Sequence, residues 1–334
     1  MRTIFSKWLV SIAVAASLVG TVSVRAAGEP LKLYVSPTGN DGADGRSEAK
    51  ALKTLGKALS SYESSCDSRS TQITLAAGGY GKEQLTLRRV PCPLEITSNG
   101  GYAKFDGGGD GTWFTLAAAG AGKIDLTISG MEVMSYQSAV SINGNRNDVD
   151  GWIAGVKLLK NRFVRIGSFR EGQPPATAAV RLVNARGVLI EGNEFQTIRN
   201  LSHCGGLHSV YIAHDSSDNR IVRNSFVDGC GETIKVRDSS NNNLIERNRF
   251  SQQEGSALLL DSYCDSASGA ECTKAEPECP SWNNIFRDNT IEGPRPPSNK
   301  KITGARKAAR QLPAACSVRS DRGERIREEG TSQR

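Results

Sequence analysis

The sequence is poor in aromatic residues and has no cysteine pair in C-x-x-C spacing. Aromatic side chains make up 6% of the 334 residues, whereas glycine occurs 35 times. With its short clusters of Asn, Ser and Asp, this composition indicates many turns and little long helix. Because the eight cysteines lack C-x-x-C spacing, zinc binding and thiol redox chemistry are disfavoured. The cysteines indicate disulfides formed in an oxidising compartment.

The sequence contains no long apolar run beyond residue 22. Two basic residues precede an apolar stretch (8–22), and small residues follow at 24–27. This order is typical of an export signal, so we expect residues 1–26 to be a signal peptide. We therefore expect a secreted or periplasmic protein that has no membrane contact after cleavage. An uncleaved anchor is the alternative, although the stretch is short for a membrane span.

The net charge of +7 does not indicate nucleic-acid binding. Residues 300–334 carry a net charge of +6 and the expected signal adds three basic residues, so the rest of the chain has 29 basic and 31 acidic residues. A basic stretch with neither helical nor strand periodicity indicates a solvated chain end. We expect no nucleic-acid partner, and we expect residues 299–334 to form a poorly ordered tail.

The stretch 207–250 contains nearly the same pattern twice. Each copy has an alternating run, a polar turn, a short apolar run and an Asn-x-Phe ending, and Asn224 and Asn248 lie 24 residues apart. Such a repeat of short strands is typical of a solenoid. Equivalent positions are Asn99, Met131, Asn161, Asn193 and Asn289. We predict that these asparagines take the left-handed turn conformation and hydrogen-bond from coil to coil. The phenylalanines two places later should stack inside the coils.

The repeats predict one domain, residues 27–298, in a monomeric protein. A short strand from Leu33 and a helix over 49–62 would cover its open N-terminal end. The spacing of the cysteines allows disulfide bonds between coils. Cys66 with Cys92 and Cys204 with Cys230 lie about one coil apart, Cys264, Cys272 and Cys279 share one loop, and Cys316 is either a partner for that loop or a free thiol.

The N-terminal segment carries a family resemblance. The string YVSPTGNDGADGRS (34–47), the expected helix and ITLAAGGY (73–80) resemble the opening of secreted proteins of the pectate-lyase-like superfamily. The resemblance implies an all-β, right-handed parallel β-helix with an N-terminal capping helix. It also implies an acidic polysaccharide as partner, because lyases of this superfamily act on alginate or pectin with a Lys or Arg base on an outer face, often near Ca²⁺.

Strand alternation predicts which side chains of the central coils point outward. The expected inward pairs are Val180/Leu182, Val210/Ile212, Ile234/Val236 and Leu258/Leu260. The outer face would then carry Ser141 and Asn143, Arg181 and Val183, Tyr211 and Ala213, Lys235 and Arg237, and Leu259 and Asp261. His208 and Glu232 share a register before these strands, and His214 and Asp238 share one after them. A solvated sheet face would also account for such charges.

This outer face suits β-elimination from a uronic-acid glycoside. A base must remove the proton beside a carboxylate while cations neutralise that carboxylate. Lys235 is the candidate base beside the charge of Arg237, Arg181 or Arg237 would hold the carboxylate, and Tyr211 would protonate the leaving oxygen. His208 is a further catalytic candidate. Asn143 and His214 are candidate substrate contacts.

Three local motifs bear on a calcium cofactor and on reactions other than β-elimination. The pair Gly231–Glu232 resembles the calcium-ligand step of the alginate-lyase branch, which implies Ca²⁺ bound by Glu232 and Asp261, although the branch's Leu-Arg-His-Gly is replaced at 258–261. His214–Asp215 matches the end of the Asp-Pro-His-Asp motif of mannuronan epimerases. Pectin hydrolases require paired aspartates and Gly-His-Gly, which are missing. We therefore expect a polysaccharide lyase, with a uronate C5-epimerase or a non-catalytic glycan-binding or structural module as alternatives.

Overall fold

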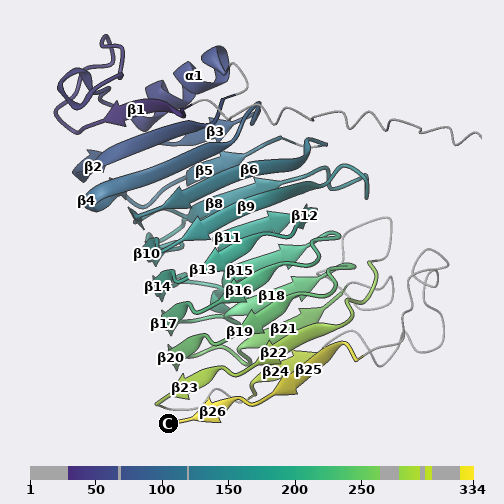
Figure 1. Cartoon of the computed structure of the whole chain (residues 1–334). Coiled ribbons are helices and arrows are strands. Elements are labelled where there is room, and N and C mark those ends of the chain that lie inside the picture. Colours follow the sequence, from purple (N-terminus) through teal and green to yellow (C-terminus); the bar gives the residue numbers. More distant parts are fainter. Residues whose placement is uncertain (1–28, 67–68, 119, 264–277, 294–297, 303–323) are drawn as a thin grey trace, which may run out of the picture.

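The computed structural model describes residues 29–66, 69–118, 120–263, 278–293, 298–302 and 324–334. It shows a right-handed parallel β-helix whose coils stack along one axis (Figure 1). The strand pairings are parallel and form one eight-stranded sheet and one 18-stranded sheet. The predicted fold class is therefore confirmed.

The eight-stranded sheet, here called sheet I, takes one strand from each coil. Its strands are β3 (Leu85–Leu87), β5 (Thr112–Leu116), β8 (Ser138–Asn143), β11 (Ala178–Val183), β15 (His208–Ala213), β18 (Ile234–Arg237), β21 (Leu259–Ser262) and β24 (Lys300–Ile302). The inward side chains of its central strands are aliphatic and fully buried. Sheet I therefore has one face in the core and one outer face.

The 18-stranded sheet consists of two runs that share the long strand β4 (Leu94–Asp106). The first run also contains β1 (Leu31–Val35), β2 (Thr71–Gly81), β6 (Gly122–Ser129), β9 (Ile153–Leu159), β13 (Leu189–Glu191), β16 (Arg220–Val222), β19 (Leu244–Glu246), β22 (Asn284–Arg287) and β25 (Ile326–Glu329), with β12 (Ala185–Arg186) beside β9. The second run contains β7 (Met131–Met134), β10 (Arg162–Ile166), β14 (Glu194–Ile198), β17 (Ser225–Gly229), β20 (Arg249–Gln253), β23 (Thr290–Glu292) and β26 (Ser332–Gln333). Each complete coil thus has three faces.

A helix covers the N-terminal end of the solenoid, as expected. The helix α1 (Leu55–Ser65) begins later than predicted because Thr54 is its N-cap and accepts a hydrogen bond from the Lys57 amide at 3.1 Å. A short 3-10 turn, η1 (Glu48–Lys50), precedes it. Tyr62 is fully buried and donates to the Cys92 carbonyl at 2.6 Å. The helix is thereby fixed to the first coils.

Buried asparagines form ladders along the axis. The side-chain nitrogens of Asn161, Asn193, Asn224 and Asn248 each donate to the next asparagine of the series, ending at Asn289, at 3.0–3.1 Å. A second ladder joins Asn219, Asn243 and Asn284 at 2.9 Å. The coil-to-coil amide bonds are therefore confirmed, and the second ladder is an addition to the prediction.

Two details of the asparagine prediction are wrong. The left-handed residue of each turn precedes the asparagine, as at Arg223 (φ 55) and Arg247 (φ 54), so asparagine is required for its hydrogen bonds rather than for its backbone conformation. Asn99 lies outside the ladder, because the residue in register with Met131 is Ala103.

Phenylalanines stack inside the coils as predicted. The rings of Phe163, Phe195, Phe226 and Phe250 follow one another with centroids 4.8–5.0 Å apart, and all four side chains are buried. Because the rings lie in the core, they are structural and do not form a sugar-binding surface.

Two predicted disulfides are present, and the C-terminal boundary needs correction. Cys66 bonds to Cys92 and Cys204 bonds to Cys230, while Cys279 is also disulfide-bonded. The solenoid continues past residue 298, because β24, β25 and β26 pair with β21, β22 and β23. Part of the expected tail is thus ordered solenoid. The expected signal peptide, Cys264, Cys272 and Cys316 lie outside the described residues.

Candidate active site

One line of outward side chains crosses sheet I along the solenoid axis. Arg181 of β11 lies in register with Tyr211 of β15, and Tyr211 lies in register with Lys235 of β18. The full line, here called the central column, runs through Thr115, Ser141, Arg181, Tyr211, Lys235, Leu260 and Lys301. Neighbouring strands lie about 4.8 Å apart. The structure therefore brings Arg181, Tyr211 and Lys235 together, as the alternation predicts.

Tyr211 occupies the middle of the three. Its side chain is 9% exposed and packs with Ala178 and Ala213 in a small apolar cluster outside the main core. Burial raises the pKa of the Tyr211 phenol, and the nearby guanidinium groups of Arg237 and Arg181 oppose this only in part. A phenol with a raised pKa keeps its proton at neutral pH. Tyr211 is therefore suited to donate a proton.

Arg181 places a positive charge beside Tyr211. It is half-buried, and it has no ion pair or hydrogen bond with any residue that the structure describes. Its fixed, planar guanidinium can bind a carboxylate through two parallel hydrogen bonds. Of the two arginines expected to hold a substrate carboxylate, Arg181 is the one whose geometry permits it.

Arg237 forms an ion pair with a carboxylate of the protein itself. Its Nε donates to Glu278 Oε2 at 2.5 Å, and the Glu278 side chain is only 2% exposed. The buried carboxylate of Glu278 offsets the charge of the half-buried Arg237, so Arg237 has less effect on Lys235 than the sequence suggested. No motif or repeat position points to Glu278, which lies in the long insertion between β21 and β22.

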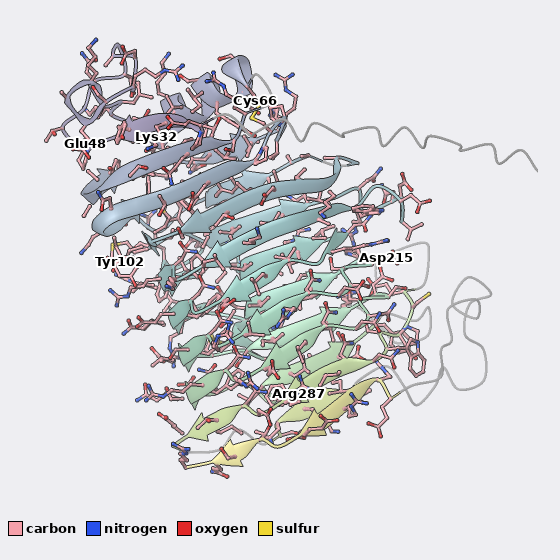
Figure 2. All side chains as sticks on the ribbon, viewed as in Figure 1. Lys32, Glu48, Cys66, Tyr102, Asp215 and Arg287 are labelled. Carbon is pink, nitrogen blue, oxygen red and sulfur yellow. A yellow bond between two sulfur atoms is a disulfide. The ribbon has the colours of Figure 1, made fainter. Side chains whose placement is uncertain are left out.

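A cluster of His214, Asp238 and Glu278 lies where the strands of sheet I end. His214 Nδ1 is 2.7 Å from Asp238 Oδ2, which confirms the shared register of these residues. One ligand atom from each of the three residues lies within 4.8 Å of the others. Asp215, which follows His214, lies at the right-hand margin of the solenoid in Figure 2. His214 is therefore beside the central column, oriented by a carboxylate.

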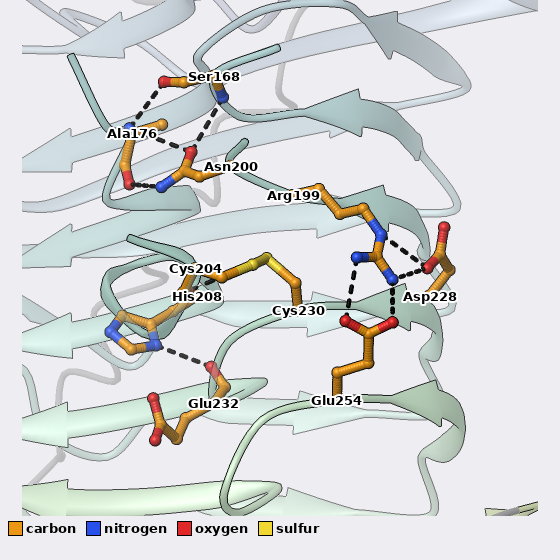
Figure 3. The surroundings of a disulfide bond; sticks show 10 residues. All are labelled: Ser168, Ala176, Arg199, Asn200, Cys204, His208, Asp228, Cys230, Glu232 and Glu254. Atoms are coloured by element: carbon orange, nitrogen blue, oxygen red, sulfur yellow. Dashed lines mark hydrogen bonds and ion pairs between the residues drawn. A yellow bond between two sulfur atoms is a disulfide. The ribbon is translucent and has the colours of Figure 1, made fainter. Parts of the chain in front are cut away.

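His208 is buried beneath the column. It is 1% exposed, and its ring is stacked on Tyr211 with centroids 5.8 Å apart. Its Nδ1 donates to the Glu232 carbonyl at 2.8 Å (Figure 3). Burial, assisted by the charge of Lys235, lowers the pKa of His208 to about 4. The ring is therefore neutral at pH 7, and its contacts support Tyr211 rather than exchange protons with solvent.

Asp261 does not lie on the outer face, so the expected calcium pair is not formed. β21 pairs with β18 one residue away from the expected register, with Lys235 opposite Leu260 and Val236 opposite Asp261. A shift by one residue moves each side chain to the other face. Leu260 is outward instead of Leu259, and Asp261 is fully buried and bonded to Arg325 at 2.7 Å.

Glu232 lies apart from this buried pair, and its carboxylate accepts a hydrogen bond from Ser256. Glu232 and Asp261 therefore do not fit a shared calcium ion. Asn143 lies beside the column on β8, where its Oδ1 accepts a hydrogen bond from Ser141 at 3.0 Å. Its side chain remains half-buried and able to donate to a ligand.

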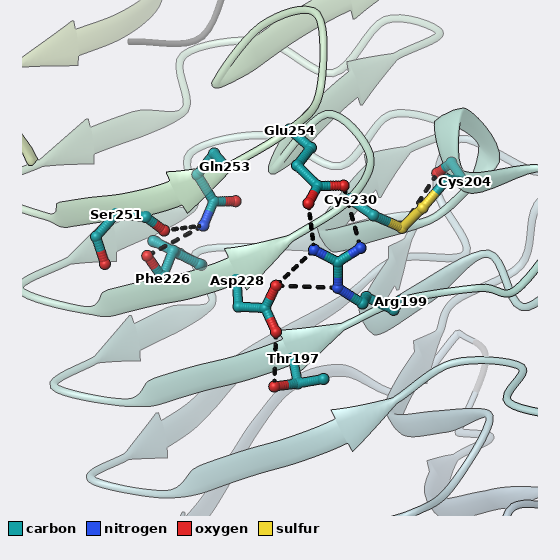
Figure 4. A network of polar contacts seen from close by, with 9 residues as sticks. All are labelled: Thr197, Arg199, Cys204, Phe226, Asp228, Cys230, Ser251, Gln253 and Glu254. Carbon is teal, nitrogen blue, oxygen red and sulfur yellow. Dashed lines mark hydrogen bonds and ion pairs between the residues drawn. A yellow bond between two sulfur atoms is a disulfide. The ribbon is translucent and has the colours of Figure 1, made fainter. Parts of the chain in front are cut away.

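Ordered contacts border the N-terminal ends of the sheet I strands. The loop before β11 is fixed by a hydrogen bond from the Ala176 amide to Ser168 Oγ at 2.9 Å and by one from the Asn200 side chain to the Ala176 carbonyl at 2.9 Å (Figure 3). Nearby, Arg199 binds Asp228 and Glu254 at 2.6 and 2.5 Å (Figure 4). These carboxylates raise the pKa of Arg199 and occupy its guanidinium. Arg199 therefore joins coils and is not a substrate contact.

No helix in the described parts of the chain is long and apolar enough to cross a membrane. No family model matches the sequence, and no curated protein matches it.

Several solved structures are similar to this chain. They include pectate lyase Pel9A (12% identity, TM-score 0.43, covering 81% of this chain and 76% of that one) and alginate lyase from Paenibacillus sp. str. FPU-7 (12%, 0.44, 83% and 92%). A third is GH136 lacto-N-biosidase from Eubacterium ramulus (12%, 0.42, 90% and 67%). The strand pairings themselves show that the chain shares the β-helix fold expected from its resemblance to pectate-lyase-like proteins.

Proposed function

We propose that this protein is a polysaccharide lyase that cleaves a uronate-containing polymer by β-elimination. The observation that carries the proposal is the alignment of Arg181, Tyr211 and Lys235 on three consecutive strands of sheet I. These side chains supply a carboxylate-binding cation, a proton donor and an amine in one line. β-elimination from a uronate requires these three groups.

Each group has one role in the reaction. Arg181 binds the carboxylate and stabilises the charge that develops on it as the adjacent C5–H bond breaks. Lys235, with its Nζ unprotonated, accepts the C5 proton. The electron pair forms the C4–C5 double bond and expels the glycosidic oxygen, which takes the proton of Tyr211. Proton transfer from Lys235 back to Tyr211, directly or through water, restores the site.

A uronate C5-epimerase is the second candidate, and the His214–Asp238 pair favours it. Both reactions begin with removal of the C5 proton, and epimerisation differs only because a second group returns a proton to the opposite face. A histidine oriented by a carboxylate at 2.7 Å is suited to exchange protons. The two reactions therefore share Arg181 and differ in the step that follows.

One experiment separates lyase, epimerase and binding module. The purified protein is incubated with alginate, pectate and glycosaminoglycans in deuterated buffer. Absorbance follows unsaturated uronate, and nuclear magnetic resonance follows deuterium at C5. The lyase proposal predicts unsaturated product on at least one polymer. Deuterium incorporation without unsaturation would identify an epimerase. Binding without either signal would identify a non-catalytic module and overturn the proposal.

A further inference from the structure

A pocket lies at the N-terminal end of the solenoid, between the outer face of β1, β2 and β4 and the loop that follows β1 (Figure 1). Its volume is about 350 Å³, and we call it the cap pocket. Its strands belong to the 18-stranded sheet, so it shares no strand with the central column. Pockets that bind small molecules start at about 300 Å³. The cap pocket is therefore large enough for one sugar unit.

The lining of the cap pocket combines an aromatic ring with polar side chains from four elements. Tyr34 of β1 lies in register with Thr74 of β2, and Ala76 of β2 lies in register with Asn99 of β4. Glu48 of η1 completes the set, and Figure 2 shows it at the same end of the molecule as β1. The four polar side chains have no hydrogen bond or ion pair with any residue that the structure describes. They are therefore available to a ligand.

The walls of the cap pocket are fixed before a ligand binds. The loop after β1 is held to that strand, because the Ser36 amide donates to the Leu52 carbonyl and the Leu52 amide donates to the Tyr34 carbonyl, both at 2.8 Å. The Tyr80 hydroxyl donates to the Ala76 carbonyl at 2.8 Å. Because the walls are formed in advance, binding costs little free energy for ordering them.

The side chains of the cap pocket match the groups of an uncharged sugar. A tyrosine such as Tyr34 offers an apolar ring to the C–H groups of a sugar and a hydroxyl to its oxygens. The Asn99 amide and the Thr74 hydroxyl both donate and accept hydrogen bonds, whereas the Glu48 carboxylate only accepts them. Among the described residues that line the pocket, Glu48 alone is charged. A sugar that carries a carboxylate would therefore be repelled.

We propose that the cap pocket is an accessory binding site for an uncharged hexose unit of a glycan. This inference does not rest on the proposed elimination, because the cap pocket and the central column lie on different sheets. The two sites also differ in charge preference, since Arg181 suits a carboxylate and Glu48 opposes one. The protein would thus bind an uncharged glycan on one face while the column acts on an acidic polymer.

The test observes each site through its own tyrosine. The rings of the seven tyrosines are isotope-labelled for nuclear magnetic resonance, and the Tyr34 and Tyr211 signals are assigned by their loss in Tyr34→Phe and Tyr211→Phe. The protein is titrated with glucose, galactose and mannose, and with the uronates that differ from them only at C6. We expect at least one uncharged sugar to shift the Tyr34 signal saturably, and the matching uronate to act there at least about tenfold more weakly.

Two results of this titration would overturn the inference. One is a Tyr34 signal that none of the three uncharged sugars shifts. The other is an equal or tighter affinity of the matching uronate at Tyr34. A shift of Tyr211 by a uronate reports the central column and is scored separately, so binding there is not mistaken for binding in the cap pocket.

Two substitutions of exposed lining side chains give a second readout at the Tyr34 signal. We expect Asn99→Ala to lower the affinity for the uncharged sugar by about threefold to tenfold, because a hydrogen-bonding amide is lost. Glu48→Gln removes the charge and should bring the affinity for the uronate to within about threefold of that for the uncharged sugar. Asn147→Ala, in the exposed loop after β8, is the control and should change neither affinity. Wild-type affinities in folded Asn99→Ala and Glu48→Gln would contradict the proposed site.

The accessory site and the lyase fail separately. A saturable Tyr34 response in a protein that forms no unsaturated uronate would retain the cap pocket and reject the lyase. Formation of unsaturated uronate without any Tyr34 response to uncharged sugars would retain the lyase and reject the cap pocket.

Discussion

At the scale of single residues, burial shifts the pKa values of Tyr211 and His208 in opposite directions. Tyr211 lies beside two guanidinium groups, yet burial raises the pKa of its phenol, so the proton stays on the oxygen that must donate it. His208 is affected in the opposite sense, because burial disfavours its charged form and leaves a neutral ring under Tyr211. The site therefore contains a protonated Tyr211 phenol packed on a neutral His208 ring.

Removing the Tyr211 hydroxyl should abolish proton donation while preserving the ring. We expect Tyr211→Phe to lower kcat for elimination by about 10²- to 10⁴-fold, the usual contribution of a positioned acid. Affinity for the polymer should change little. Steady-state kinetics on the best substrate measure both values. A Tyr211→Phe protein with wild-type kcat would assign the acid elsewhere.

The buried His208 should make stability depend on pH. Its folded pKa of about 4 is below the unfolded value of 6.5, so as pH falls between these values the unfolded state takes up a proton first. The contribution to the unfolding free energy is complete above pH 6.5 and declines by up to about 1.4 kcal/mol per pH unit.

The measurement is urea unfolding from pH 7 to pH 4.5, with His208→Gln compared with the wild type. We expect a shallower pH dependence in His208→Gln. His203→Gln changes an exposed histidine and should match the wild type. Parallel curves for all three proteins would show that His208 titrates normally when folded.

At the scale of elements, the repeat fixes most of what the sequence can predict. The asparagine ladder, the phenylalanine stack and the outward positions of β11, β15 and β18 follow from a strand period and a coil length. Prediction fails at β21 because residues 257–260 are all apolar, so alternation does not distinguish inward from outward side chains. The resulting one-residue error placed Asp261 outside and Leu260 inside.

Site features that depend on loops were also beyond prediction. Glu278 reaches Arg237 after an insertion whose path no period specifies, so the offset of the Arg237 charge could not be foreseen. In contrast, the contact between His214 and Asp238 follows from their equal places in successive coils, because no insertion separates them.

The asparagine ladder should be the most sensitive element of the fold. Asn224 accepts from the backbone and side chain of Asn193 and donates to Asn248. We expect Asn224→Ala to reduce the unfolding free energy by at least about 2 kcal/mol, because buried donors and acceptors lose partners. Chemical denaturation gives the value. Asn147→Ala, at an exposed loop position, is the control, and equal effects of the two substitutions would contradict the ladder's role.

At the scale of the whole molecule, the last coil is joined to the solenoid by a buried ion pair. Arg325, just before β25, binds Asp261 of β21 at 2.7 Å and lies over the ring of Tyr263. Burial raises the pKa of Asp261 to about 6, and Arg325 opposes this shift. Residues that composition assigned to a tail are therefore part of the fold.

Removing the positive member of this pair should destabilise the protein. We expect Arg325→Met to lower the unfolding free energy by about 3–5 kcal/mol at pH 8, because the Asp261 carboxylate would be left buried without its partner. Arg327→Met, at a side chain that is 55% exposed, is the matched control. Thermal unfolding at pH 8 and pH 5 gives a second check, because protonation of Asp261 should reduce the loss at pH 5. An equal, small effect of both substitutions would contradict an ordered last coil.

The most direct test of the proposed lyase is the rate at which Lys235 variants form unsaturated uronate from the best acidic polymer. We expect Lys235→Gln to lower kcat/KM by at least about 100-fold, and Arg181→Gln to do the same. Lys157→Gln, on the outer face of β9 and paired with Asp125 at 3.2 Å, should retain the wild-type value. Wild-type rates in folded Lys235→Gln and Arg181→Gln would show that the central column does not carry the reaction.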